Sequence, residues 1–139
     1  MQERKISLVL THLDAVYEYT GSIEASMAVR KFIGKYKPGI YQLISPITNS
    51  PLIKEGEFFN SAYGNVPVEL ISRLNDDKNN CCGVVLAGGI DGRCLSETFT
   101  ELKNNGLIAR ILLEGIFPRK GIFERAYRKI IHSGDYTFL

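Results

Sequence analysis

Cys94 stands at the start of an amphipathic segment, directly after the apolar run 83–89 and a glycine-rich turn. The N-terminus of a helix offers unpaired backbone N–H groups and a partial positive charge. Both stabilise a thiolate, and the N–H groups can bind a developing oxyanion. Cys94 therefore has the placement of a nucleophile. Free cysteines are also among the most frequently buried residues, so this segment taken alone favours a packing role.

Asp14 and Lys54 could supply the remaining groups of a nucleophilic site. Asp14 ends the apolar segment 5–13, where a carboxylate can cap a turn. It could equally accept the thiol proton and later return it to a leaving group. Lys54 lies in the short segment 51–56, and its ammonium group would favour the ionised carboxylate and thiolate. Taken singly, Asp14 is more often a cap and Lys54 a solvent-facing side chain; together with Cys94 they favour catalysis.

Strand-like and helix-like segments alternate along the whole chain. Strands are expected over 5–13, 39–46, 51–56, 83–89, 107–115 and 135–139, and helices over 22–36, 65–75, 93–106 and 121–134. Ser22 is the expected N-cap of the first of these helices. Apolar strands separated by amphipathic helices predict a three-layer α/β fold of the Rossmann-like type, with a mostly parallel six-stranded sheet and helices on both faces. Ligands bind such sheets at the carboxyl ends of the strands, where the three reactive residues are expected to meet.

The composition restricts the class of protein. The 139 residues suit a single domain over 1–139, and the net charge of +2 is too small to favour nucleic acid or an anionic membrane as the main partner. No apolar run approaches the roughly 18 residues of a membrane helix, and a signal peptide is not expected. Three cysteines, two of them adjacent, do not resemble a disulfide framework. We therefore expect a cytoplasmic protein with reduced thiols.

Three segments resemble, in their order and spacing, the isochorismatase-like cysteine hydrolases, the superfamily of nicotinamidases, N-carbamoyl amidases and isochorismatases. The first segment ends a strand with Asp14 and has an aromatic residue, Tyr19, five positions later. The second carries Lys54 before the Ser-Ala-Tyr sequence at 61–63 and a helix. The third has a glycine after an apolar strand, Cys94 six residues later, then a helix, a glycine and another strand.

The resemblance implies a catalytic triad of Asp14, Lys54 and Cys94. Cys94 would attack an amide or imide carbonyl and form an acyl-enzyme, from which water releases the acid. The family also has a cis peptide before the cysteine, which corresponds here to the bond between Gly89 and Ile90. The oxyanion would then be bound by the N–H groups of Ile90 and Cys94.

The chain departs from the family between the second strand and Lys54, where only the sequence ITNSPL remains. In the family this region carries substrate-contacting loops and, in nicotinamidases, Asp and His metal ligands. The two histidines, His12 and His132, are far apart in sequence, so we predict neither a metal nor another cofactor. Gly89 replaces a usual aliphatic residue, and Glu114 replaces a usual Asp. The short loops leave the pocket open or completed by a neighbouring subunit, and the resemblance implies a homo-oligomer, a dimer or larger.

The predicted function is hydrolysis of a C–N bond in a small molecule. Tyr19, Phe59 and Tyr63 are the expected pocket residues, together with Phe58, and would suit a flat or apolar ligand, although aromatic side chains more often pack in a core. The alternative is a non-catalytic binding or assembly protein of the same fold, in which the side chains of the triad would not converge. Ether hydrolysis without a role for the cysteine is less favoured because the cysteine is present. A dinucleotide site is disfavoured because GGIDGRC does not fit the GxGxxG pattern.

Overall fold

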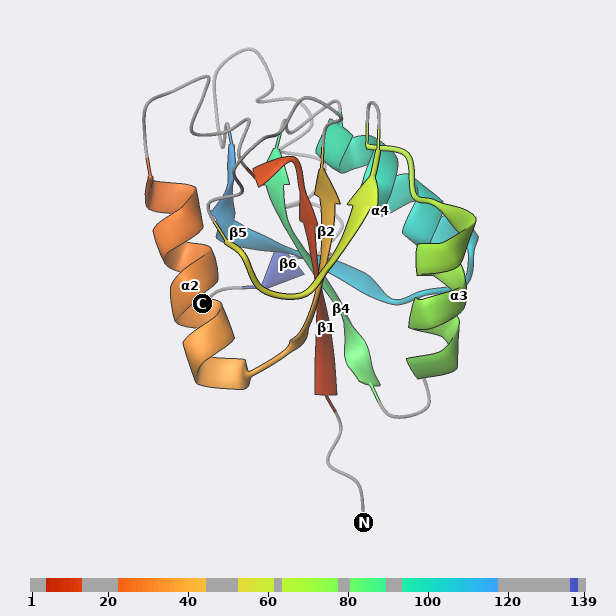
Figure 1. The fold of residues 1–139 in the computed structure, drawn as a ribbon, viewed down its shortest axis with the longest axis horizontal. Helices are drawn as coiled ribbons and strands as arrows, with labels where there is room; N and C mark the ends of the chain where they lie inside the picture. Colours follow the sequence, from red (N-terminus) through yellow and green to blue (C-terminus); the bar gives the residue numbers. More distant parts are fainter. Residues whose placement is uncertain are drawn as a thin grey trace.

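The computed structural model contains one parallel sheet between two layers of helices (Figure 1). It describes residues 5–13, 23–44, 53–61, 64–77, 81–89, 94–117 and 136–137. The strands are β1 (Lys5–Thr11), β2 (Gly39–Ile44), β3 (Glu57–Asn60), β4 (Cys81–Gly89), β5 (Ala109–Phe117) and β6 (Tyr136–Thr137). They pair in the order β3-β2-β1-β4-β5-β6, and every pairing is parallel. The predicted α/β fold class is confirmed.

Helices cover both faces of the sheet. The helix α2 (Glu24–Tyr36) packs on one face, and α3 (Val68–Asp77) and α4 (Cys94–Asn104) pack on the other (Figure 1). Side chains of a strand point alternately to the two faces, so β1 contributes side chains to both cores. The core under α2 includes Leu8, Leu10, Val29, Phe32 and Leu112, and the core under α3 and α4 includes Val9, Leu70, Leu86, Leu95 and Leu102.

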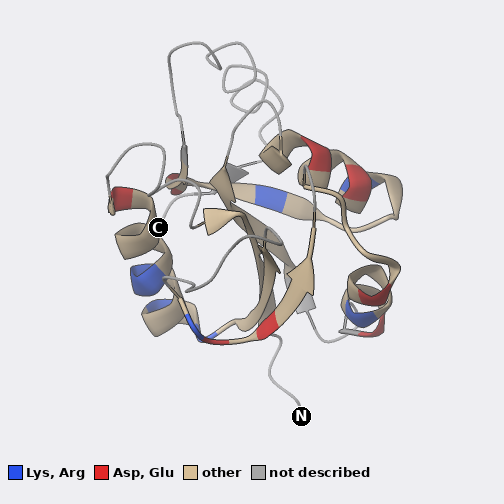
Figure 2. Ribbon diagram, turned by 45° about the horizontal axis from the view of Figure 1, so that its top comes forward, with Lys and Arg blue, Asp and Glu red and all other residues tan. Residues whose placement is uncertain are grey.

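Charged side chains lie mainly on the helices (Figure 2). Basic residues are prominent on α2, whereas α3 and α4 carry most of the acidic ones. The ion pair between Arg73 of α3 and Glu57 of β3 has an N–O distance of 2.7 Å, and both side chains are about half exposed. None of the helices in the described part of the chain is long and apolar enough to cross a membrane.

The helix ends follow local rules, with one correction. The Asn-Asn-Gly sequence ends α4 as expected: Gly106 has a φ of +79°, and Leu107 N–H donates to the carbonyl oxygen of Leu102 at 3.1 Å. The N-cap of α2 is Ile23 rather than Ser22, which lies outside the described residues. The hydroxyl of Ser26, within the first turn of that helix, donates to the carbonyl oxygen of Ile23 at 2.8 Å.

The third strand begins at residue 57, so the expected strand over 51–56 is wrong. Gly56 turns the chain with a φ of +90°, and a Cβ there would lie 2.3 Å from the carbonyl oxygen of Ile40. Before this turn, the side-chain amide of Gln42 donates to the carbonyl oxygens of Ile53 and Glu55 at 2.6 and 3.0 Å. A side chain of β2 thus satisfies these carbonyls. After the turn, residues 57–60 pair with β2.

Two further expected elements lie partly or wholly outside the residues that the structure describes. The helix expected over 121–134 lies outside the described residues. The closing strand expected over 135–139 is present as β6 at residues 136–137, paired with β5. The strand expected over 107–115 is β5, shifted to Ala109–Phe117.

Candidate active site at the carboxyl ends of β1 and β4

The order of the strands reverses between β1 and β4. From β1 the chain builds the sheet outward through β2 and β3, and from β4 it continues in the opposite direction through β5 and β6. In open α/β sheets, ligands bind in the crevice outside the carboxyl ends of the strands at this switch point. The two residues that face each other there are Thr11, the last residue of β1, and Gly88 of β4.

Gly88 lets the two central strands meet closely at that end. Its φ is +114°, and a Cβ at this position would lie 2.0 Å from the carbonyl oxygen of Thr11. Any side chain would therefore collide with the backbone of β1, in a conformation that L residues rarely adopt. The close approach of β1 therefore explains why a glycine stands at position 88. Six residues later, the chain reaches Cys94.

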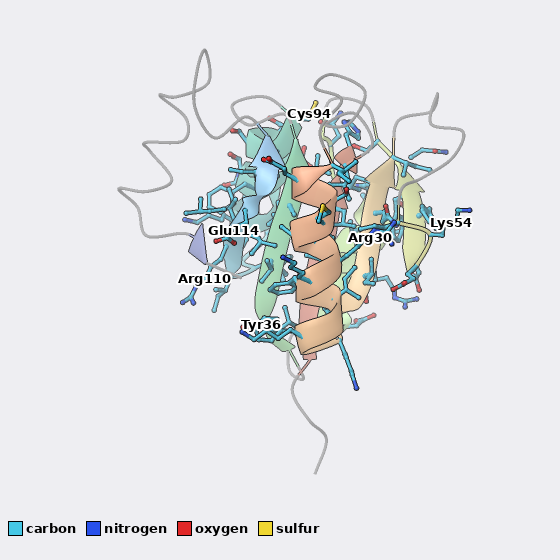
Figure 3. The ribbon with its side chains drawn as sticks, turned by 90° about the vertical axis from the view of Figure 1, so that its left-hand side faces the viewer. Arg30, Tyr36, Lys54, Cys94, Arg110 and Glu114 are labelled. Carbon is cyan, nitrogen blue, oxygen red and sulfur yellow. The ribbon has the colours of Figure 1, made fainter. Side chains whose placement is uncertain are left out.

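Cys94 is the first residue of α4 and is partly buried. Its thiol lies where the sequence predicted it, at a helix N-terminus beyond the carboxyl end of β4 (Figure 3). The backbone of Gly64, in the segment after β3, lies directly against this first turn. Gly64 has a φ of +83°, and a Cβ there would lie 2.0 Å from the carbonyl oxygen of Cys94. The residue that follows the Ser-Ala-Tyr sequence therefore lies beside Cys94.

A pair of threonines connects three parts of this site. The hydroxyl of Thr11 donates to the hydroxyl of Thr98 on α4 at 3.1 Å. The Thr98 hydroxyl in turn donates to the carbonyl oxygen of Gly64 at 2.7 Å and lies 3.0 Å from that of Cys94. Both threonine side chains are fully buried. The end of β1, the segment after β3 and the first turn of α4 therefore share one hydrogen-bonded network.

Sequence reasoning missed both threonines, although a signal for one of them was present. Thr98 follows Cys94 by four residues, so the two side chains share one face of a helix. A hydroxyl among the apolar residues of such a face needs a buried partner. No local pattern identified Thr11, because it continues the apolar strand that precedes it.

His12 and Ser61 hold the segment after β3 next to the end of β1. His12 adopts a left-handed backbone conformation with a φ of +46°. Its Nε2 lies 2.8 Å from the carbonyl oxygen of Ser61, which requires the Nε2–H tautomer to donate. The hydroxyl of Ser61 donates to the carbonyl oxygen of Asn65 at 2.6 Å. In the segment before α3, this hydroxyl therefore makes a structural hydrogen bond.

Lys54 does not approach Cys94 in this structure. Its side chain is exposed, and Figure 3 shows it pointing outward from the edge of the sheet, away from Cys94. The cause is the position of β3: Lys54 precedes the amino end of that strand, whereas Cys94 follows the carboxyl end of β4. The expectation that the two residues share one edge of the sheet does not hold, and a catalytic role for Lys54 stays a prediction.

The other predicted site residues are distributed between described and undescribed parts of the chain. Asp14, Tyr19, Tyr63 and Ile90 lie outside the described residues, as does the peptide bond between Gly89 and Ile90. Strand β1 ends at Thr11, so Asp14 comes three positions after the strand rather than at its end.

Phe59 is partly buried and packs against the core under α3 and α4, while Phe58 is 40% exposed. The pocket role of Phe59 remains a prediction. Among the residues that the structure describes, no three His, Cys, Asp or Glu side chains form a group that could hold a metal ion.

No family model and no curated protein matches the chain. Solved structures do match. A MAR1 ribonuclease from Caenorhabditis elegans has a TM-score of 0.72 at 12% identity, over 99% of this chain and 78% of that one. An isochorismatase from Pseudomonas putida has a TM-score of 0.70 at 11% identity, over 99% and 89% of the two chains. The chain has the isochorismatase-like fold.

A third similar structure is an octameric hydrolase of unknown specificity from Escherichia coli. Its TM-score is 0.66 at 10% identity, over 100% of this chain and 76% of that one. Identities this low show the fold alone. The first two proteins carry different activities in their names and the third is a hydrolase of unknown specificity, so the fold by itself does not assign a reaction.

Proposed function

We propose that the protein is a small cysteine hydrolase that cleaves a C–N bond of a small amide or imide, with Cys94 as the nucleophile. The observation that carries the proposal is the position of Cys94. Cys94 is the first residue of α4 and follows the carboxyl end of β4, at the switch point where β1 and β4 pair. Its carbonyl lies against the backbone of Gly64. Parallel α/β sheets bind ligands at this point, and a helix N-terminus stabilises both a thiolate and an oxyanion.

The proposed reaction has two steps. The sulfur of Cys94 forms a bond to the carbonyl carbon, the C–N bond breaks, and the departing nitrogen takes a proton that Asp14 has received from the thiol. Water then attacks the thioester, Asp14 accepts a proton from that water, and the proton passes to the sulfur as the acid leaves. The N–H groups of Ile90 and Cys94 would bind the oxyanion in both steps.

The test is selective labelling of the thiols combined with an assay for acid release. Iodoacetamide, substoichiometric and at neutral pH, should modify Cys94 before Cys81 or Cys82, as read by peptide mass spectrometry. The modified protein should lose its acid-releasing activity on small amides in proportion to the modification of Cys94. Equal labelling of the three cysteines, with activity retained after Cys94 is modified, would contradict the proposal.

Lys54 is the member of the proposed triad whose side chain points away from Cys94 (Figure 3), and it can be tested separately. If Lys54 holds the charges of the triad, Lys54→Ala should lower turnover by at least about 100-fold, and Lys54→Arg should restore part of it. Because the side chain is exposed, stability should change by less than about 0.5 kcal/mol. Lys31→Ala, an exposed lysine on α2, is the matched control. Unchanged turnover in Lys54→Ala removes Lys54 from the proposal and leaves Cys94 in place.

The second candidate function is a binding or assembly protein with the same fold. The observation that favours it is the separation of Lys54 from Cys94, which the non-catalytic alternative predicts. This candidate predicts that no amide releases acid and that Cys94 is labelled no faster than the other cysteines. The labelling experiment therefore separates the two functions directly.

We extend the proposal to a cytoplasmic homo-oligomer. Only a short stretch, residues 45–52, connects the end of β2 to the described segment before β3, so a neighbouring subunit could complete the pocket. The Escherichia coli hydrolase with this fold is octameric by its description. Light scattering coupled to size exclusion gives the mass in solution, and a monomer at micromolar concentration would argue against this part of the proposal.

A further inference from the structure

Thr98 makes more polar contacts at the candidate site than any single role in helix packing requires. Its hydroxyl accepts a hydrogen bond from Thr11 and has two carbonyl oxygens within reach, those of Gly64 and Cys94. A hydroxyl has one proton, so it shares that proton between the two carbonyls, and the shorter distance of 2.7 Å favours Gly64. The side chain is fully buried, so water cannot replace these bonds.

The bond to the Cys94 carbonyl fixes the first turn of α4 from inside the helix. A threonine that bonds to the carbonyl four residues earlier constrains that turn locally. The bond to Gly64 fixes the same turn from outside, against a backbone that already touches the Cys94 carbonyl. The bond from Thr11 adds a third support, from the end of β1. These three contacts determine where the residue that opens the helix can lie.

Glu101 strengthens this attachment one turn further along α4. Its carboxylate accepts a hydrogen bond from the backbone N–H of Val66 at 2.5 Å. Thr98 and Glu101 therefore fasten the same face of α4 to the segment 64–66. The contact that involves Cys94 itself runs through Thr98, whereas the contact of Glu101 lies seven residues from Cys94.

We infer that Thr98 is a positioning residue for Cys94, one that holds the first turn of α4 so that the thiol points at the bound carbonyl group. The inference rests on the proposed role of Cys94 as the nucleophile. Thr98 is itself buried, with its hydroxyl toward the end of β1, and acts only through Cys94. Small displacements of a reacting group cost much of the rate, about 100-fold for a misplacement of 1 Å.

The test compares isosteric and conservative replacements. Thr98→Val removes the hydroxyl and keeps the shape, and Thr98→Ser keeps the hydroxyl. Thr100→Val is the matched control, because Thr100 lies on the exposed face of the same helix. The probe is the second-order rate at which iodoacetamide alkylates Cys94, with kcat and KM measured separately on any amide found by the acid-release assay. Circular dichroism melting reports whether each variant is folded.

Thr98→Val should lower the alkylation rate of Cys94 and kcat by about tenfold, because the first turn of α4 loses its buried attachment, with KM nearly unchanged. Thr98→Ser should return both to within about twofold, and Thr100→Val should match the wild type. Glu101→Ala should have a smaller effect than Thr98→Val, because it removes the more distant attachment.

A folded Thr98→Val protein that alkylates at the wild-type rate would overturn the inference, and so would a Thr98→Ser protein that shows no recovery. Should Thr98→Val fail to fold, Thr11→Val removes the donor to Thr98, and an unchanged alkylation rate in that protein overturns the inference equally. Failure of the hydrolase proposal is recognised separately, because it appears as the absence of acid release from any amide or as turnover that survives Cys94→Ala. The alkylation rate still reports on Thr98 in that case.

Discussion

Cys94→Ala is expected to abolish turnover while leaving the protein folded. Removal of a covalent nucleophile typically lowers kcat by at least about 10⁴-fold, because the remaining binding and oxyanion groups cannot replace the attacking atom. Cys94 is only partly buried and opens its helix, so loss of the thiol should cost less than about 1 kcal/mol of stability. The measurement is acid release from a small amide, with thermal unfolding followed in parallel.

Two further variants make this result specific to the thiol. Cys94→Ser keeps the size of the side chain and a weaker nucleophile, and it should be nearly as inactive as Cys94→Ala because a hydroxyl needs a stronger activating base. Cys82→Ala, at the start of β4, should keep wild-type turnover. Acid release by Cys94→Ala at more than a tenth of the wild-type rate would exclude Cys94 as the nucleophile and leave the binding function as the better candidate.

The fold could be predicted from the sequence because its signals are local. Apolar runs such as 83–89 and amphipathic segments such as 94–104 each reveal their own structure, and their alternation implies parallel strands. The position of Cys94 followed from the same signals, because the run ends in glycines and the helical pattern begins soon after. Gly88 shows why a glycine is needed near the end of β4, because only a residue without a Cβ fits against the carbonyl oxygen of Thr11.

The ends of β1 and β3 could not be predicted in the same way. Leu13 is buried, which extends the apolar pattern of β1, but His12 leaves the strand by adopting a φ of +46°. Such a conformation is uncommon for a residue other than glycine, and no neighbouring residue signals it. Ile53 is buried likewise, under the α2 side of the sheet, although its backbone is bonded by Gln42 rather than by a strand. At both places, the burial of an apolar residue therefore does not indicate that its backbone pairs in a strand.

These two boundaries change where Asp14 and Lys54 stand relative to the strands. A strand over 5–13 would have placed Asp14 at its carboxyl end, whereas the observed end of β1 is Thr11. A strand over 51–56 would have brought Lys54 along the sheet toward Cys94, whereas β3 begins after it. The buried threonine pair, Thr11 and Thr98, lies at the end of β1, and the catalytic role of Asp14 stays a prediction. The position of Cys94 at the start of α4 thus followed from the sequence, and the catalytic roles of Asp14, Lys54 and Cys94 stay predictions.

Gly88→Ala is expected to destabilise the protein strongly. The added Cβ would lie 2.0 Å from the carbonyl oxygen of Thr11, so the ends of β1 and β4 would have to separate. Backbone strain at a positive φ and overpacking each cost about 1–3 kcal/mol. The sum, roughly 2–6 kcal/mol, is a large part of the total stability of a small protein. Urea denaturation measures this difference in the free energy of unfolding.

Gly106→Ala separates the two contributions to that loss. Gly106 also has a positive φ, +79°, but a Cβ there would meet no atom within 4 Å. Its replacement should cost only the backbone strain, about 1 kcal/mol, and should leave the alkylation rate of Cys94 unchanged. Gly88→Ala should lower both the free energy of unfolding and the alkylation rate of Cys94. The collision with Thr11 displaces the carboxyl end of β4, and the chain continues from that end to Cys94. Equal losses of stability in the two variants would show that the close contact between β1 and β4 does not determine the geometry of the site.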